Sequence, residues 1–300
     1  MTGFCVRRIS TITLCAALAG VLAHAPAFAG QNQSGPVAAD QAPPPIKLAQ
    51  QADNPFSALV GKRRERVSEY SPARAVERYV LTSDDRVFLF EERGANARVR
   101  FLCSPEDTRF DCTIDGVGGS PEIHLLSATR APRGDVIYKT AEGETLLRIA
   151  AYGGATVFWP GETHGIAASK SFGDDRPLSL VFEDYESARR RAQSASVHVG
   201  ALIGSPIFFD VGAGRRAAGA NAAVLCDAVL TAAKGIASVA DDPIGARAVA
   251  DRIKRVAFLP GAAPEVGLNG SILEIVYVPN QDANGRPSST AVANFLEETL

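Results

Sequence analysis

The residues best suited to chemistry lie on one glycine-rich stretch between positions 152 and 172. It carries the only tryptophan of the chain, Trp159, together with Glu162, His164 and Lys170. Glu162 and His164 are two positions apart, so in an extended loop both side chains point the same way and can hold one polar group. An aromatic ring beside an acid suits a sugar or a peptide. These four residues are the candidate ligand-binding set, and the competing interpretation is a barrel-closing strand with Trp159 in the core.

Other chemical motifs are incomplete. Gly212 to Ala217 match the G-x-G-x-x-A loop that approaches a pyrophosphate, but the acid expected about 20 residues later is missing, so no cofactor is expected. The sequence contains no G-x-S-x-G, H-E-x-x-H or C-x-x-C motif, so no catalytic residue and no metal ligand is assigned. His124 and His198 lie in apolar runs and are expected in the core or a sheet. A hydrolase without a recognisable motif stays open.

Two cysteines are spaced for a disulfide. Cys103 and Cys112 flank eight residues, and each adjoins an apolar strand-like piece, which predicts a hairpin. A bridge across such a loop stabilises a fold by roughly 2–3 kcal/mol. The alternatives are two unpaired thiols or a metal-bound pair. Cys226 falls on the apolar stripe of a predicted helix, where a buried, inert thiol is expected.

The first 29 residues are typical of an export signal. Arg7 and Arg8 precede an apolar run, and Ala27-Phe28-Ala29 supplies the small residues that a signal peptidase reads. The run of about 14 residues is too short to cross a bilayer core of roughly 30 Å. No later stretch reaches 18 uninterrupted apolar residues, so the mature chain is expected to have no transmembrane segment. Export to the periplasm is the predicted localisation.

The mature chain carries an acidic excess. Removing Arg7 and Arg8 lowers the basic count from 31 to 29 against 33 acids, a net charge of −4. A nucleic-acid partner is therefore not expected, because such proteins normally carry a basic excess. Residues 30–55 are rich in Gln, Pro and Ala and predict a disordered linker.

Two regions of different character follow the linker. Residues 56–182 predict a mainly antiparallel β region, because short alternating runs are separated by turn residues. Its seven strand candidates span 76–81, 86–91, 98–103, 122–126, 136–139, 146–152 and 155–159. Residues 183–300 predict helices at 184–195, 222–238, 243–251 and 289–300 with strands at 207–211, 255–259 and 271–278. The fold class is therefore α+β, an antiparallel barrel-like or sandwich-like meander followed by a mixed half, packed as one domain with it or separate.

Three segments carry a family resemblance. Tyr152 to Gly161, Gly165 to Ser169 and Ala240 to Pro243 resemble an uncharacterised family of secreted bacterial proteins, a domain of unknown function. The resemblance covers most of the mature chain and implies export, but no activity, substrate or catalytic residue.

The leading hypothesis is a non-catalytic periplasmic binding or envelope-associated protein, whose partner is an envelope component or a small ligand. The alternative is a periplasmic hydrolase acting on envelope peptide or sugar.

Overall fold

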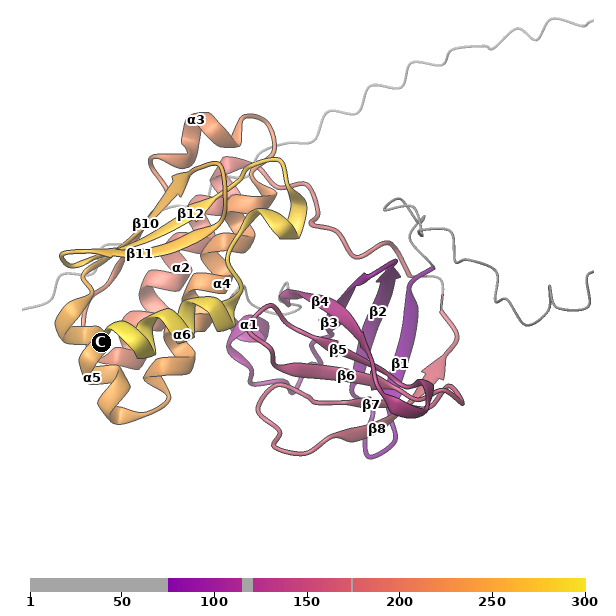
Figure 1. Ribbon diagram of the computed structural model, residues 1–300. Coiled ribbons are helices and arrows are strands. Elements are labelled where there is room, and N and C mark those ends of the chain that lie inside the picture. Colours follow the sequence, from indigo (N-terminus) through magenta and orange to yellow (C-terminus); the bar gives the residue numbers. More distant parts are fainter. Residues whose placement is uncertain (1–74, 115–120, 174) are drawn as a thin grey trace, which may run out of the picture. The chain divides into compact units, whose positions relative to one another are not determined.

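The computed structural model describes residues 75–114, 121–173 and 175–300 (Figure 1). The predicted signal peptide (1–29), the predicted linker (30–55) and the start of the predicted β region lie outside the described residues. All described residues belong to one compact unit.

Eight antiparallel strands form a closed barrel in which each strand pairs with the next and β8 pairs back with β1. The strands are β1 (Glu77–Leu81), β2 (Val87–Arg93), β3 (Asn96–Phe101), β4 (Ile123–Arg130), β5 (Val136–Lys139), β6 (Thr145–Ile149), β7 (Ala155–Val157) and β8 (Ile166–Ser171). Alternate side chains such as Phe88, Phe90, Val99 and Phe101 meet in the interior and fill it. The predicted meander is confirmed, and it closes as a barrel with a packed core.

The eighth strand lies inside the glycine-rich stretch that holds the predicted site. The sequence predicts seven strands and leaves 166–171 in a loop, whereas the structure pairs β8 with both β7 and β1. Its small and polar side chains give little alternation, with Ala168 alone fully buried on the barrel side. The backbone pairing of two neighbours therefore defines this strand more than its own sequence does.

A short helix, α1 (Phe110–Thr113), connects β3 to β4 across residues that include the gap at 115–120. The predicted hairpin around the disulfide is wrong, because Cys112 and Thr113 lie in the helix α1 and not in a strand. Ile114 is buried among the apolar residues of the C-terminal half, so this segment leaves the barrel instead of adding a strand to it.

The C-terminal half combines helices with a second sheet, whose strand order is β11-β12-β10-β9. β10 runs parallel to β9 and β12, and β11 is antiparallel to β12. The elements are α2 (Tyr185–Ile203), β9 (Phe208–Asp210), α3 (Gly214–Ala218), α4 (Ala223–Ala240), α5 (Pro243–Arg252), β10 (Arg255–Pro260), β11 (Glu265–Asn269), β12 (Ile272–Tyr277) and α6 (Ser289–Thr299), with 3-10 turns η1 (Pro132–Gly134) in the barrel and η2 (Asp282–Gly285) before α6. The α+β class is confirmed.

Helix α4 is the centre of this half. It contacts α2 and α6 along its sides and the strands β10 and β12, so that nearly every one of its side chains is buried (Figure 1). Among the described residues α4 alone is long and apolar enough to cross a membrane, but 78% of it is buried inside the fold. The close packing of α4 on α6 depends on Gly235, where a Cβ would approach the carbonyl oxygen of Ser289 to 2.6 Å.

Candidate functional site

The structure places Trp159 in the barrel core, just after β7. Its side chain is 4% exposed, and its ring meets that of Phe101 edge-on at 4.8 Å. The guanidinium groups of Arg86 and Arg109 lie 4.9 and 5.1 Å from the ring centre. Trp159 therefore fills and closes one end of the barrel, as in the core interpretation of its sequence context.

The other three residues of the predicted set are spread over the barrel surface. Glu162 pairs with Arg86 at 3.2 Å, and exposed His164 shares a hydrogen bond with its neighbour Thr163. Lys170 lies on β8 and pairs with Glu77 at 2.7 Å. Arg86 thus links Glu162 to Trp159, whereas Lys170 is engaged on β1. A ligand-binding role for these residues stays a prediction.

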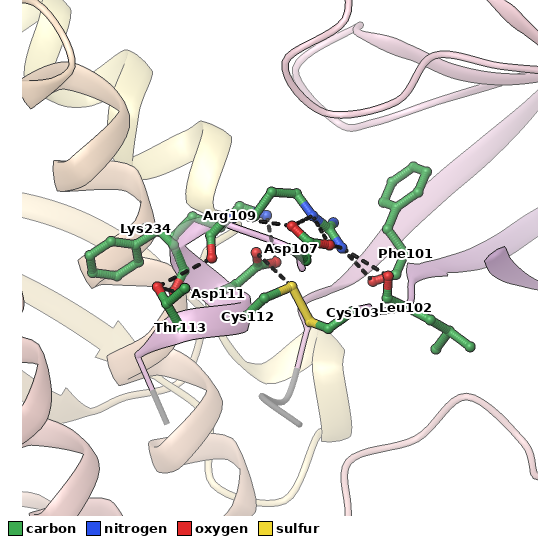
Figure 2. Close-up of a disulfide and its surroundings, with 10 residues drawn as sticks. Phe101, Leu102, Cys103, Asp107, Arg109, Asp111, Cys112, Thr113 and Lys234 are labelled. Carbon is green, nitrogen blue, oxygen red and sulfur yellow. Dashed lines mark hydrogen bonds and ion pairs between the residues drawn. A yellow bond between two sulfur atoms is a disulfide. The ribbon is translucent and has the colours of Figure 1, made fainter. Parts of the chain in front are cut away.

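The predicted disulfide is confirmed. Cys103 and Cys112 are joined with their Cα atoms 5.6 Å apart (Figure 2). Cys226 is buried in α4 and takes no part in a disulfide. Within the loop, Arg109 pairs with Asp107 at 2.7 Å and donates to the carbonyl of Leu102 at 3.0 Å. The Asp107 carboxylate lies within 4.8 Å of both sulfur atoms. These three side chains could in principle be metal ligands. The two sulfur atoms are bonded to each other and the Asp107 carboxylate binds Arg109, so all three already have partners.

The glycine motif at Gly212 to Ala217 is explained by packing. A Cβ at Gly214 would approach the hydroxyl of Tyr277 to 2.7 Å and a methyl group of Leu225 to 2.9 Å. The glycine therefore allows α3 to lie close to β12 and α4.

A cluster of charged side chains joins the barrel half to the C-terminal half. The Glu122 cluster consists of Asp111, Glu122, Asp227, Lys234 and Arg286. Both acids of the barrel half meet one cation: the Lys234 ammonium lies 3.1 Å from Glu122 and 3.3 Å from Asp111, and Figure 2 shows it reaching the disulfide loop. Side chains more than 100 positions apart are thus held together.

Arg286 provides the second cation of this cluster. Its Nε donates to Asp227 at 2.6 Å and its terminal nitrogen to the carbonyl of Ile123 at 2.9 Å. Another terminal nitrogen lies 3.5 Å from Glu122. The guanidinium is buried, so these partners replace the hydrogen bonds that water would otherwise supply.

Glu122 is ionised and His124 is neutral in this environment. Burial raises the pKa of Glu122, but Lys234 and Arg286 outweigh it and hold that pKa well below its ordinary value. Burial lowers the pKa of His124 to about 4, and this exceeds the opposing effect of Glu122. The imidazole is therefore uncharged at neutral pH, and its 3.9 Å approach to Glu122 is not an ion pair there.

A cavity of about 420 Å³ lies beside the Glu122 cluster. We call it the α6 cavity, because the residues that begin α6 form one wall, with the β5–β6 turn, β4 and the start of β11 forming the others. Its polar lining residues are His124, Thr140, Glu142, Glu265, Arg286, Ser288 and Thr290. Its apolar lining includes Leu125, Val266, Ala291 and Phe295.

Glu142, which lines the α6 cavity, has one carboxylate oxygen with a hydrogen-bond partner and one without. Its Oε1 accepts a hydrogen bond from Ser288 at 2.6 Å, and the Ser288 hydroxyl in turn accepts from the amide of Ala291 at 2.9 Å, capping α6. Its Oε2 has no exposed surface and no hydrogen-bond partner among the described residues. A buried carboxylate oxygen normally has a partner, so this atom is an unused acceptor, and a donor in the cavity reaches it when the Glu142 side chain turns.

A serine, an acid and a histidine also meet behind the cavity wall, where His124 is the one that lines the cavity, but their order is unlike that of a hydrolase. The Ser289 hydroxyl donates to Glu122 at 2.5 Å, and Glu122 lies between it and His124. In a catalytic triad the imidazole lies between the hydroxyl and the acid and removes the proton. Here the hydroxyl is engaged by a carboxylate of very low basicity.

Sequence reasoning missed this region. His124 was expected in the core or a sheet, and it is buried on β4. His198 was expected to be similar, but it is exposed on α2. Glu142, Ser288 and Arg286 carry no motif, and only the Ser-Ser pair before a predicted helix marks one of them as a cap.

A family model described as Domain of unknown function (DUF4908) matches residues 55–296. No curated protein and no solved structure matches the chain.

Proposed function

The chain belongs to this family of unknown function, and we propose that it is a non-catalytic binding protein of the periplasm that takes a small ligand into the α6 cavity. The observation that carries the proposal is the Oε2 atom of Glu142, a buried acceptor in the cavity wall with no partner among the described residues. A ligand with a hydroxyl, ammonium or guanidinium group supplies the missing donor when the Glu142 side chain turns this oxygen toward the cavity.

The cavity has the general character of a ligand site. Its volume of about 420 Å³ falls within the range of roughly 300–1,000 Å³ that small-molecule pockets occupy. Apolar side chains such as Leu125 and Phe295 share the lining with a few polar groups. This combination gives affinity through burial and orientation through hydrogen bonds.

The paired charges beside the cavity support binding without catalysis. Lys234 and Arg286 already neutralise the acids of the Glu122 cluster, and Ser289 is held by Glu122. Ser289 is therefore not activated by this cluster, because the carboxylate that it meets already binds both cations. The periplasmic location rests on the export signal predicted in the first 29 residues, and the disulfide suits an oxidising compartment.

A cavity-filling substitution tests the proposed site. The purified chain is dialysed against a small-molecule extract of cell envelopes, and the retained compounds are identified by mass spectrometry. Wild type is expected to concentrate at least one compound that Ala291→Trp does not, because an indole at this position occupies the cavity. Ala201→Trp, on the exposed side of α2, is the matched control and should retain the compound. Equal retention by all three proteins would contradict the proposal.

The hydrolase alternative is favoured by one observation, the convergence of buried Ser289 and Glu122 with His124, which lines the α6 cavity. It requires the Ser289 hydroxyl to leave Glu122 and bond His124. Release of soluble fragments from purified peptidoglycan by wild type, and its loss in Ser289→Ala, would establish that function instead.

A further inference from the structure

A second pocket of about 360 Å³ adjoins the α6 cavity. The two share Leu125 and Ala141 in their linings, so one molecule can extend from one to the other across an apolar boundary. We call the second the Arg93 pocket. It is lined on its other sides by Arg93, Asn96, Ser127 and Asn284.

The two pockets differ in the charge that they present. Glu142 and Glu265 line the α6 cavity, and its one cation, Arg286, already binds Asp227 and the carbonyl of Ile123. The surplus charge facing a ligand there is negative. Burial, together with repulsion from Glu142, raises the pKa of nearby Glu144, which is consistent with an acidic surrounding.

The Arg93 pocket presents hydrogen-bond donors instead. One terminal nitrogen of Arg93 binds Glu91 at 2.9 Å, while the Nε of Arg93 is buried with no partner in the described part of the chain. Glu91 also accepts from the amide of Leu178 at 3.0 Å, so its charge is divided between two donors. Arg98, on the same wall, is already paired with Asp282 at 2.5 Å. The unused N–H of Arg93 suits an anionic acceptor such as a carboxylate, which reaches this buried nitrogen when the partly exposed side chain turns toward the pocket.

We infer that the two pockets form one site for a short peptide with free ends, its ammonium group at Glu142 and its carboxylate at Arg93. The inference rests on the proposed binding function and specifies its ligand class. The apolar boundary at Leu125 and Ala141 suits a side chain in the middle of the peptide, and the amide groups of Asn96 and Asn284 can bond its backbone. An extended tripeptide reaches about 10 Å, a length suited to two adjoining pockets.

Three forms of one probe test this assignment by isothermal titration calorimetry on the full mature chain. The probe is the tripeptide Ala-Leu-Ala, and the other forms carry an acetylated N-terminus or an amidated C-terminus. Each modification removes one charged end, so each is expected to weaken binding to wild type roughly tenfold to hundredfold.

Variants then assign each end to one pocket. Glu142→Gln is expected to bind the free and the acetylated peptide about equally while still discriminating against the amide. Arg93→Gln is expected to show the converse, and Arg93→Lys, which keeps the charge but not the Nε donor, covers the case in which Arg93→Gln does not fold. The exposed pair Glu186 and Arg189 on α2 provides the controls Glu186→Gln and Arg189→Gln, which should match wild type.

Equal binding of the three peptides by wild type, no binding of any, or an acetylation penalty that persists in Glu142→Gln would overturn the inference. Failure here is distinguishable from failure of the proposed function. If Ala291→Trp still abolishes retention of an envelope compound while the peptides do not bind, the cavity stands and only the ligand class is wrong. If the peptides bind Ala291→Trp as they bind wild type, they do not occupy the α6 cavity.

Discussion

Glu122 shows how one buried carboxylate depends on distant partners. It pairs with Lys234 of α4 and accepts a hydrogen bond from Ser289 of α6. These partners lie 112 and 167 positions away in the sequence. Removing one partner of a buried ion pair leaves the other charge without compensation, which costs more than the pair itself contributes. Substituting a single partner of Glu122 is therefore expected to lower the stability of the fold strongly.

Lys234→Met is expected to lower the free energy of unfolding by about 3–5 kcal/mol, because Asp111 then loses the cation it is paired with and Glu122 keeps only Arg286 at 3.5 Å. Urea denaturation measures the change. Lys254→Met, at an exposed position, is the control and should shift stability by less than about 0.5 kcal/mol. Adding Glu122→Gln to Lys234→Met should recover part of the loss, and a double variant no more stable than Lys234→Met would argue against charge as the cause.

His124 gives the protein an acid sensitivity of known sign. Its pKa is about 4 in the fold against an ordinary 6.5, so the unfolded chain binds the proton first and stability falls as the pH drops from 6.5 toward 4. Between pH 6.5 and 5 the loss is expected to be about 1–2 kcal/mol. His124→Gln should flatten this part of the stability profile, whereas His198→Gln, on the exposed surface of α2, should keep it. A profile of His124→Gln as steep as that of wild type would show that other groups are responsible.

At the scale of single residues, few contacts can be predicted from the sequence. Cys103 and Cys112 could be paired because nine positions separate them and loop closure over that distance is geometrically simple. The ion pair between Glu122 and Lys234 could not be predicted from the sequence, because no spacing rule connects residues that meet only after both halves have folded. Trp159 shows the opposite difficulty, since a glycine-rich neighbourhood indicates an exposed loop while the ring itself is buried.

At the scale of elements, local pattern decided which strands and helices could be predicted. β3 alternates apolar residues with polar ones, β2 begins with a run of four apolar residues, and α4 carries a continuous apolar stripe, so the sequence predicts all three. β8 and β11 were missed because Ala168 and Gly267 replace the large side chains that mark a strand. Their strand character comes from neighbours on each side or from the β12 edge.

The disulfide bond between Cys103 and Cys112 can be removed by substitution or by reduction, and its contribution to stability can then be measured. The double variant Cys103→Ser, Cys112→Ser is expected to lose roughly 2–3 kcal/mol of stability, because the unfolded chain regains the freedom of the closed loop. Thermal unfolding with and without a phosphine reductant measures it. Reductant should lower the melting temperature of wild type to that of the variant and leave the variant unchanged. A wild-type transition unaffected by complete reduction of the bridge would contradict the expectation.

At the scale of the whole molecule, the boundary between the predicted regions 56–182 and 183–300 is crossed by strong interactions. Arg98 of β3 donates to Asp282 at 2.5 Å, and Asp282 also accepts from the amide of Leu180 at 2.7 Å. With the Glu122 cluster, these contacts couple the barrel to the helices.

Calorimetry is therefore expected to show one transition for residues 75–300, with equal calorimetric and van't Hoff enthalpies. Lys234→Met should shift the whole transition downward, because an uncompensated charge between the halves weakens both. Two resolved transitions in wild type would mean that the halves unfold separately and that the predicted regions are independent domains.

The mixed origin of the Glu122 cluster also bears on synthesis of the chain. All eight barrel strands end by Ser171, so a ribosome completes them before it adds Lys234 or Arg286. A nascent barrel at that stage must hold Asp111 and Glu122 either in water or buried without a cation, and the second arrangement is strongly unfavourable. The last closing contacts of the barrel around Glu122 thus wait for the C-terminal third to emerge. For the same reason, a gene fusion that transfers the barrel without its helices delivers a fragment with two uncompensated acids.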